Sequence, residues 1–316
     1  MTNWRLSAVA PLAALLAALL AACGGGGGDA PSAAAPAAPS TPTPTPEPGA
    51  PTLTGNNALD GYNWFIYRRA LLGLPTLARN SLVDAAAQGH SDYQRLNNTI
   101  THTETQGLPG FTGVALNNRL AAAGYTLAGR SAYGEVISAT SNSTGFYQAE
   151  ELITAIYHRF VIFDPIFKEI GTGAATTASG YTYFTADFTA SNGYNSLGAG
   201  RFVVYPANNQ AAVPTNFFSD SESPDPVPGQ NEVGYPISVH ADLDGNVTVQ
   251  SFTVAPRGGA ALATRLLSHT GDSATSERAA AIVPLAPLRA ATTYDVSFSG
   301  MVGGVAVTRA WSFSTK

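Results

Sequence analysis

Few side chains in this 316-residue chain can exchange protons near neutral pH, since it has five histidines and one cysteine. Apolar residues recur every three or four positions ahead of His158, which predicts a helix from about Thr144 to just past His158. The pair Asp164-Pro165 then forces a turn, because proline fixes φ and bars the preceding residue from the helical region. An imidazole at a helix end beside such a turn could line a cleft and serve as a base or a metal ligand.

Other catalytic motifs are missing from the sequence. It contains no G-x-S-x-G elbow, H-E-x-x-H motif, Walker loop or dinucleotide fingerprint. The run Gly24 to Gly28 has no strand before it and no helix after it, and Gly171-Thr172-Gly173 predicts a turn into the next strand. These absences exclude serine hydrolases and nucleotide-dependent enzymes.

The charge distribution excludes one class of partner. The net charge is -5 and the pI is near 5.5. Lysine and arginine form no cluster anywhere in the sequence, so it lacks the electrostatic footprint of a nucleic-acid-binding protein.

The N-terminus has the pattern of an export signal. Arg5 precedes an apolar run from Leu6 to Leu20, which is too short to span a bilayer comfortably. The run ends in L-A-A-C and resembles a bacterial lipobox. The resemblance implies cleavage before Cys23 and attachment of a lipid to Cys23, which would anchor the protein in a membrane. Gly24 rather than Asp follows, which in Gram-negative lipoproteins implies sorting to the outer membrane. The alternative is a signal peptide with an incidental cysteine.

Residues 1–22 are therefore predicted to be a lipoprotein signal peptide, and residues 23–52 a disordered tether of Gly, Pro, Ala, Ser and Thr. Such a composition cannot bury enough apolar surface to offset the entropy of ordering. Cys23 is the only cysteine, so no disulfide can form within the mature protein and no cysteine nucleophile is available.

Residues 53–190 predict helices flanking a small sheet. Apolar spacing and capping residues predict helices over 59–70, over 82–96 with Asn80 or Ser81 as cap, and over 113–123 with Thr112 as cap and Gly124 as stop. Extended segments are expected around 134–137 and 181–189.

This segment resembles the bacterial branch of the CAP superfamily (cysteine-rich secretory, antigen 5, pathogenesis-related 1), also called SCP-like. The matching runs, in the family's order, are GLPTLARNSLVDAAAQGHSDYQRLN, TITHTE, FTGVALNNRLAAAGY, YGEVIS and YHRF with DPIFKEIGTG. The resemblance implies an α-β-α sandwich with a principal cleft lined by two histidines and two acidic residues.

By position in these runs, His102 and His158 match the family's cleft histidines and Glu135 matches the glutamate of its G-E-N motif. Glu150 and Glu151 lie about two helical turns before His158, so neither is obviously the second acid. Two neutral imidazoles could bind a divalent ion such as Zn²⁺, with a nearby carboxylate orienting one ring. The alternative is that the histidines are buried, hydrogen-bonded and purely structural.

The remaining histidines favour structural roles. His90 lies beside the buried stripe of the second predicted helix, and His240 and His269 have no acidic or histidine constellation in sequence. The run 242–246, D-L-D-G-N, lacks the distant glutamate of a calcium loop and predicts an Asp-Gly turn between strands.

Residues 200–316 predict an all-β domain. The proline-rich run SDSESPDPVPGQNEVG predicts a loop across a sheet or an extended edge, and Gly303-Gly304 predicts a hairpin turn. The ending resembles bacterial Ig-like repeats through L-x-x-x-T-x-Y-x-V followed by W-S-F-x-T. The resemblance implies a β-sandwich used for adhesion, spacing or support.

The whole chain is thus expected to be an α+β lipoprotein of the cell envelope, periplasmic or surface-exposed. Its expected function is binding, with the CAP cleft taking a divalent metal and a lipid, glycan, peptide or other small-molecule or protein ligand. Two alternatives stay open. One is a metal-assisted hydrolase of peptide or cell-wall substrates with Glu135 as general base and His102 and His158 as metal ligands. The other is a structural or adhesion protein in which the CAP fold is a scaffold.

Overall fold

The computed structural model describes residues 5–6 and 47–316. Cys23 and most of the predicted signal peptide and tether lie outside these residues. Within the described ranges, no helix is long and apolar enough to cross a membrane. The end of the predicted tether is described, and both carboxylate oxygens of Glu47 accept hydrogen bonds from Arg68, at 2.6 and 2.8 Å. The chain is therefore in contact with the folded domain from Glu47 onward.

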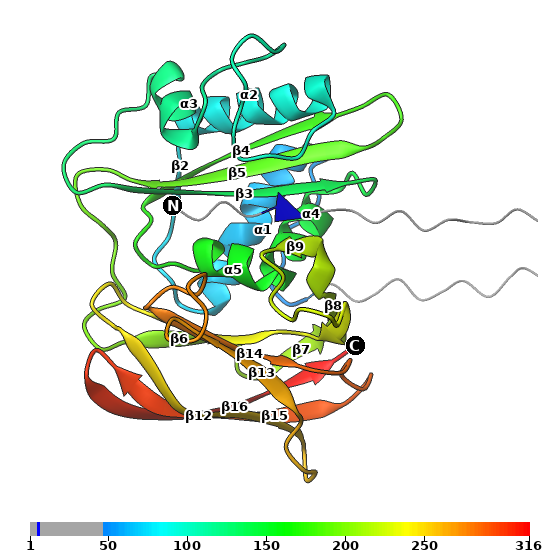
Figure 1. Ribbon diagram of the computed structural model, residues 1–316, viewed down its shortest axis with the longest axis vertical. Helices are drawn as coiled ribbons and strands as arrows, with labels where there is room; N and C mark the ends of the chain where they lie inside the picture. Colours follow the sequence, from blue (N-terminus) through cyan, green and yellow to red (C-terminus); the bar gives the residue numbers. More distant parts are fainter. Residues whose placement is uncertain (1–4, 7–46) are drawn as a thin grey trace, which may run out of the picture.

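The first half of the described chain is a mixed sheet with helices on both faces (Figure 1). Its strand order is β2 (Ala78–Arg79), β4 (Glu169–Thr176), β5 (Thr182–Ala190) and β3 (Ala132–Thr140). Helices α2 (Ser81–Asn97) and α3 (Leu116–Ala122) cover one face, and α1 (Asn57–Leu71), α4 (Gly145–Thr154) and α5 (Ile156–Ile162) lie on the other. The predicted α-β-α sandwich is confirmed.

Two predicted helices differ from the structure. The helix expected from Thr144 to His158 breaks at Ala155, whose ψ of 117° is extended, so His158 lies at the start of α5 and not near a helix end. The helix expected to begin at Gly113 begins at Leu116. It starts late because the carboxylate of Glu104 already accepts the backbone N–H groups of Thr112 and Gly113, at 2.6 and 3.1 Å.

Glycines in β4 allow α2 to pack directly on the sheet. The predicted turn at Gly171-Thr172-Gly173 is wrong, since all three residues lie inside β4. A Cβ on Gly171 would lie 2.1 Å from the backbone nitrogen of Asp84, and one on Gly173 would lie 2.3 Å from the Cα of Gln88. The backbones of α2 and β4 therefore approach more closely than any residue with a Cβ would permit.

The C-terminal part forms two four-stranded sheets, as the predicted all-β pattern requires. One has the order β13 (Thr264–Ser268), β14 (Ala279–Pro284), β11 (Ile237–Ala241), β6 (Phe202–Tyr205), and the other β12 (Val247–Pro256), β15 (Thr293–Val302), β16 (Val305–Thr315), β7 (Gln210–Val213). Their inner faces meet, with the rings of Phe202 and Phe298 5.9 Å apart. The predicted hairpin turn at Gly303-Gly304 is confirmed, with φ of 58° and 79°.

The proline-rich run leaves the second sheet and returns toward the helices. It contains η1 (Ser219–Ser221) and the short strand β9 (Glu222–Ser223), which pairs with β1 (Arg5–Leu6). The strand before the run, β8 (Asn216–Phe218), pairs with β10 (Glu232–Gly234), which forms the end of the run. The predicted Asp-Gly turn is also present, closed by a 2.8 Å bond from Gly245 N–H to the carbonyl of Asp242.

The two halves share one apolar core. Helix α5 presses against the sheet that contains β11 and β6, where the ring of Phe163 lies 5.0 Å from Tyr205 and 5.5 Å from His240. The guanidinium of Arg159 is buried between the rings of Tyr205 and Tyr235, 4.9 Å from each, and donates to the carbonyl of Pro236 at 2.6 Å. The interface is thus packed like the interior of a single domain.

Replacing Gly173 by Ala should destabilise the protein by about 1–3 kcal/mol or more, because the new methyl group would overlap the backbone of α2. Urea unfolding followed by circular dichroism measures this change. Gly271→Ala is the matched control, since no atom lies within 4 Å of a Cβ at that position. A Gly173→Ala protein as stable as this control would contradict the close packing of α2 on β4.

Candidate functional site

His102 and Glu135 lie together, as expected from the sequence. His102 is in the loop after α2 and Glu135 is on β3, and Nδ1 of the ring lies 2.8 Å from Oε1 of the carboxylate. Burial lowers the pKa of His102, an effect that the hydrogen bond to Glu135 opposes. The imidazole is thus favoured in its neutral form, with its proton on Nδ1 and directed at Glu135.

A buried arginine fixes Glu135 from the other side. Arg119 of α3 donates to Oε2 of Glu135 and, at 3.0 Å, to the backbone carbonyl of His102. Glu135 is buried, which by itself would raise its pKa, but the charge of Arg119 and the histidines hold the pKa well below its usual range. The carboxylate of Glu135 is therefore ionised, and both of its oxygens accept hydrogen bonds. A carboxylate held in this way is a poor general base, which argues against the role proposed for it in a hydrolase.

His158 is held by an acid that the sequence did not reveal. Oε1 of Glu222, from β9, accepts the backbone N–H groups of Tyr157 and His158 at 2.7 and 3.0 Å and lies 2.8 Å from Nδ1 of His158. Ala155, the N-cap residue just before α5, provides no side-chain cap. Glu222 thus caps α5 from far along the sequence and orients the imidazole at the same time.

Atoms on both sides of this contact remain without hydrogen-bond partners. Nε2 of His158 and Oε2 of Glu222 are both buried, and no donor or acceptor in the described part of the chain reaches either atom. Buried polar atoms are nearly always paired in native proteins, so two orphans in one contact indicate a place for a ligand.

Glu150 and Glu151 do not supply the second acid. Glu150 accepts from Trp64 and Arg68 at 2.7 and 3.0 Å, whereas Glu151 accepts from Ser138 at 2.7 Å. Neither hydrogen-bonds His158. Glu222, from outside the segment that resembles the CAP family, takes that place.

The prediction that His90 is structural is confirmed by its contacts. It is fully buried on α2, with Nδ1 2.8 Å from Oε1 of Glu104 and Nε2 2.7 Å from the carbonyl of Thr101. Glu104 lies beside Arg119, at 3.9 Å. Charged and polar groups therefore alternate from His90 through Glu104, Arg119 and Glu135 to His102, with no ring nitrogen of His90 left for a ligand.

A second carboxyl group faces Glu135 across the sheet. Asp187 lies directly opposite Glu135 in the ladder between β3 and β5 and is fully buried. Burial raises the pKa of Asp187 well above its ordinary value, and the negative charge of Glu135 raises it further. Of the two carboxyl groups, Asp187 is therefore the one that favours its protonated form, because two buried carboxylates side by side do not readily ionise together.

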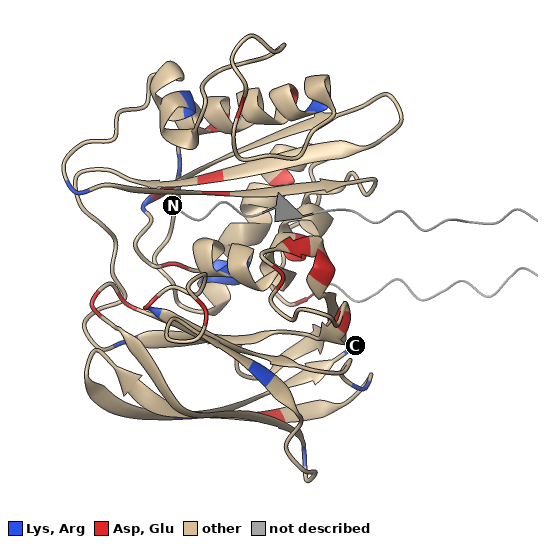
Figure 2. Cartoon of the chain, in the orientation of Figure 1, with Lys and Arg blue, Asp and Glu red and all other residues tan. Residues whose placement is uncertain are grey.

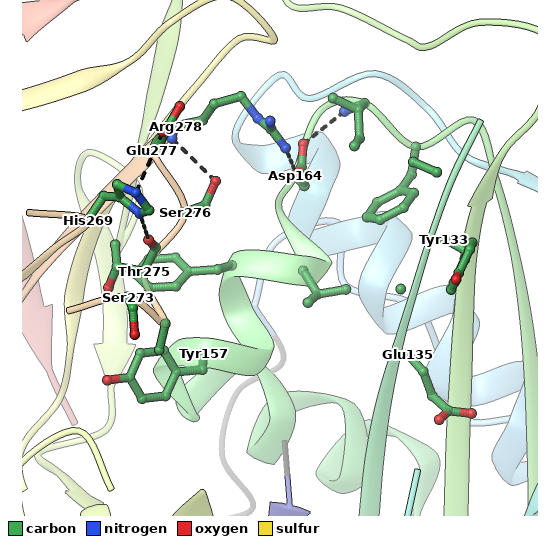
Figure 3. A pocket seen from close by; sticks show the side chains of 17 residues that line it. Tyr133, Glu135, Tyr157, Asp164, His269, Ser273, Thr275, Ser276, Glu277 and Arg278 are labelled. Carbon is green, nitrogen blue, oxygen red and sulfur yellow. Dashed lines mark hydrogen bonds and ion pairs between the residues drawn. The ribbon is translucent and has the colours of Figure 1, made fainter. Parts of the chain in front are cut away.

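A cavity of about 370 Å³ lies beside Glu135, between the two halves of the chain, and neither His102 nor His158 lines it (Figure 3). The start of β3, including Tyr133 and Glu135, forms one wall, and α5 contributes Tyr157. The loop between β13 and β14, residues 269–278, forms the opposite wall. The wall is secured by Arg278, which donates to Asp164 at 2.6 Å, and by the hydroxyl of Tyr157, which donates to Asp272 at 2.9 Å.

The donors suit a loosely held cation better than a three-ligand metal site. Each cleft histidine has Nδ1 on a carboxylate, which is the outer arrangement that metal-binding imidazoles require, and Nε2 of His158 is unused. Among residues 5–6 and 47–316, however, no three His, Cys, Asp or Glu side chains converge on one point. A cation here would have two protein ligands, with water completing its coordination, whereas catalytic zinc sites have three protein ligands.

Comparison with known proteins matches one segment of the chain to a family. Residues 63–188 match the CAP family, described as the cysteine-rich secretory protein family. This part of the chain is a CAP domain, and the C-terminal sheets lie outside the matched range. Among curated proteins, none matches the chain.

Solved structures from three bacteria are similar to the chain. An extracellular protein with an SCP domain from Bacillus anthracis str. Ames is 23% identical over 43% of this chain and 40% of its own, with a TM-score of 0.37. An outer surface protein from Borrelia burgdorferi is 16% identical over 43% and 93%, with a TM-score of 0.37. A cysteine-rich secretory protein from Staphylococcus aureus is 15% identical over 42% and 38%, with a TM-score of 0.31. The chain thus spans about two fifths of the first and third of these proteins.

Replacing Glu222 by Ala should cost about 3–5 kcal/mol of stability, because it leaves the buried start of α5 and the His158 ring without their acceptor. Urea unfolding measures this loss. Glu232→Ala, which removes an exposed glutamate from β10, is the control and should change stability by less than about 0.5 kcal/mol. Equal stabilities of the two variants would contradict the capping role of Glu222.

Asp187→Asn should make stability less sensitive to pH. The raised pKa means that folded Asp187 keeps its proton while the unfolded chain loses it, so the wild type loses stability as the pH rises from about 4 toward the folded pKa. Asparagine cannot ionise, so the variant should gain on the wild type by up to about 1.4 kcal/mol per pH unit over that range.

Unfolding in urea at pH 4, 5, 6 and 7 measures this difference between wild type and Asp187→Asn. Asp244→Asn, at an exposed position, is the control and should follow the wild type. A constant difference between wild type and Asp187→Asn across the series would show that Asp187 is ionised in the folded protein.

Proposed function

We propose that this protein is a lipid-anchored binding protein of the cell envelope, attached through Cys23 to the outer membrane. The observation that carries the proposal is the cleft built by both halves of the chain. Glu222 from the C-terminal half orients His158, and the loop 269–278 closes a 370 Å³ cavity beside Glu135. The resemblance of the L-A-A-C run to a lipobox supports the lipid anchor, and the resemblance of the C-terminal strands to Ig-like repeats supports an Ig-like fold for the C-terminal sheets.

The cleft histidines would hold a divalent cation such as Zn²⁺. His102 and His158 would be its ligands, with Glu135 and Glu222 fixing the two rings through Nδ1. When bound, the cation would supply a positive centre that polarises an oxygen of the ligand. Binding rather than hydrolysis is favoured, because Glu135 is engaged at both oxygens and only two histidines are available.

The C-terminal sheets therefore do more than space or support the CAP domain. A fragment ending at residue 190 would lack Glu222, the loop 269–278 and the tyrosines that enclose Arg159. The function must be tested on the chain from residue 23 onward, with Cys23 replaced by Ser to prevent lipid attachment.

Calorimetric titration with Zn²⁺ should show saturable binding at one site in this protein. His102→Ala with His158→Ala should abolish it, because both ligands are removed. His269→Ala, which removes a half-exposed histidine from the cavity wall, is the matched control and should bind as the wild type does. Circular dichroism must show that each variant is folded, and His102→Gln with His158→Gln is the substitute if the alanine variant is not. Absence of saturable binding in the wild type, or binding retained in a folded double variant, would refute the metal site.

A further inference from the structure

The edge of the CAP sheet next to the cleft histidines is open on one side. Among the residues that the structure describes, β3 is the last strand of its sheet and has β5 as its one hydrogen-bonded neighbour, along its whole length. Residues 135–139 of β3 are nevertheless buried. The outer edge of a strand carries backbone N–H and C=O groups that can pair with another extended chain.

The edge of the short strand β9 lies close to the outer edge of β3. β9 consists of Glu222 and Ser223, and the only strand that pairs with it among the described residues is β1. The pairing is antiparallel, with Arg5 opposite Ser223 and Leu6 opposite Glu222. β1 also contacts β3. An extended backbone therefore fits between the edges of β9 and β3, and Figure 1 shows β1 as the dark blue arrow beside β9 and α4.

Buried polar atoms next to the position of β1 have no hydrogen-bond partners, and a bound peptide could provide them. The extended backbone of β1 pairs beside Glu222, whose Oε2 is buried and unpaired, and Nε2 of His158 is unpaired in the contact between His158 and Glu222. Figure 2 shows acidic residues gathered at β9 and the adjoining turn η1, where Asp220 and Glu222 lie. The site therefore favours a ligand rich in N–H donors over an acidic one.

The space also continues into the cavity. The first residues of β3, Ala132 to Glu135, form one wall of the 370 Å³ cavity, so a chain that follows the outer edge of β3 reaches it. The cavity combines apolar walls, from Phe160, Val161 and Phe167, with the hydroxyl groups of Tyr157 and Ser273. Such a mixture can accept a side chain at the end of a bound strand.

We propose that the gap between β9 and the outer edge of β3 binds an extended peptide segment of another protein by strand addition. β1 shows the mode of binding: the backbone of the ligand pairs with β9 and lies beside β3. The predicted signal peptide contains β1, so its removal leaves the edge of β9 unpaired in the mature protein. This inference rests on the proposed binding function and names the class of its ligand.

The test uses the chain from residue 23 with Cys23→Ser and a synthetic peptide with the sequence of residues 1–10, MTNWRLSAVA, labelled with a fluorescent dye. Fluorescence anisotropy should show saturable binding. In an antiparallel pair, adjacent residues alternate between pointing their N–H groups at the partner strand and away from it. N-methylation at the position, 5 or 6, whose N–H points at β9 should therefore weaken binding at least tenfold.

Two results would overturn the proposal: no saturable binding of the unmodified peptide, or no weakening of binding by either N-methyl group. Because the backbone change is made in the peptide, a misfolded protein variant cannot produce these results. Zn²⁺ titration of the same protein separates the two hypotheses. Zinc binding without peptide binding refutes strand addition alone, whereas peptide binding without zinc binding refutes the metal site alone.

Discussion

The buried carboxylate of Glu222 fixes the position of several elements at once. Its Oε1 accepts two backbone N–H groups from the start of α5 and faces the imidazole of His158. The start of a helix carries a partial positive charge, so a carboxylate there is stabilised by the helix as well as by the ring. This contact lies where the helix breaks at Ala155 and α5 begins. It also fixes the proline-rich segment, which contains β9, against α5.

The second constraint is the burial of a positive charge between the halves. Arg159 projects from α5 into the opposing sheet, where two tyrosine rings and backbone carbonyls replace its water. Separating the halves would remove the carbonyl of Pro236 and both tyrosine rings from this guanidinium and expose the apolar surface around it. The shared core is therefore held by directional bonds as well as by apolar contact, which fixes the cavity wall at 269–278 relative to β3.

The sequence predicted the elements whose signals are local. Periodicity located α1 and α2, Asn80 marked the start of α2, and paired glycines marked the turn between β15 and β16. The order of motifs placed His102 beside Glu135. These predictions held because each depends on residues close in sequence or on a resemblance that spans the whole CAP domain.

Long-range contacts account for what could not be predicted. Periodicity continues through Ala155, and only Glu222, more than sixty residues away, ends one helix and begins the next. Glu222 gave no signal, since it lies in a proline-rich run without regular pattern. Arg119 and Asp187 did carry a signal, as single charges within otherwise apolar faces of a helix and a strand, and both proved to be partners of Glu135.

The origin of Glu222 has a consequence for how this architecture can vary. Many proteins combine domains that can be exchanged, because each keeps its own site intact. Here the second acid of the CAP site is encoded in the other half, and so is the pocket for Arg159. Fusing this CAP segment to a different C-terminal domain would leave His158 unoriented and a buried charge unpaired. A substitution in one half that alters the contacts of Glu222 or Arg159 therefore requires a matching substitution in the other half.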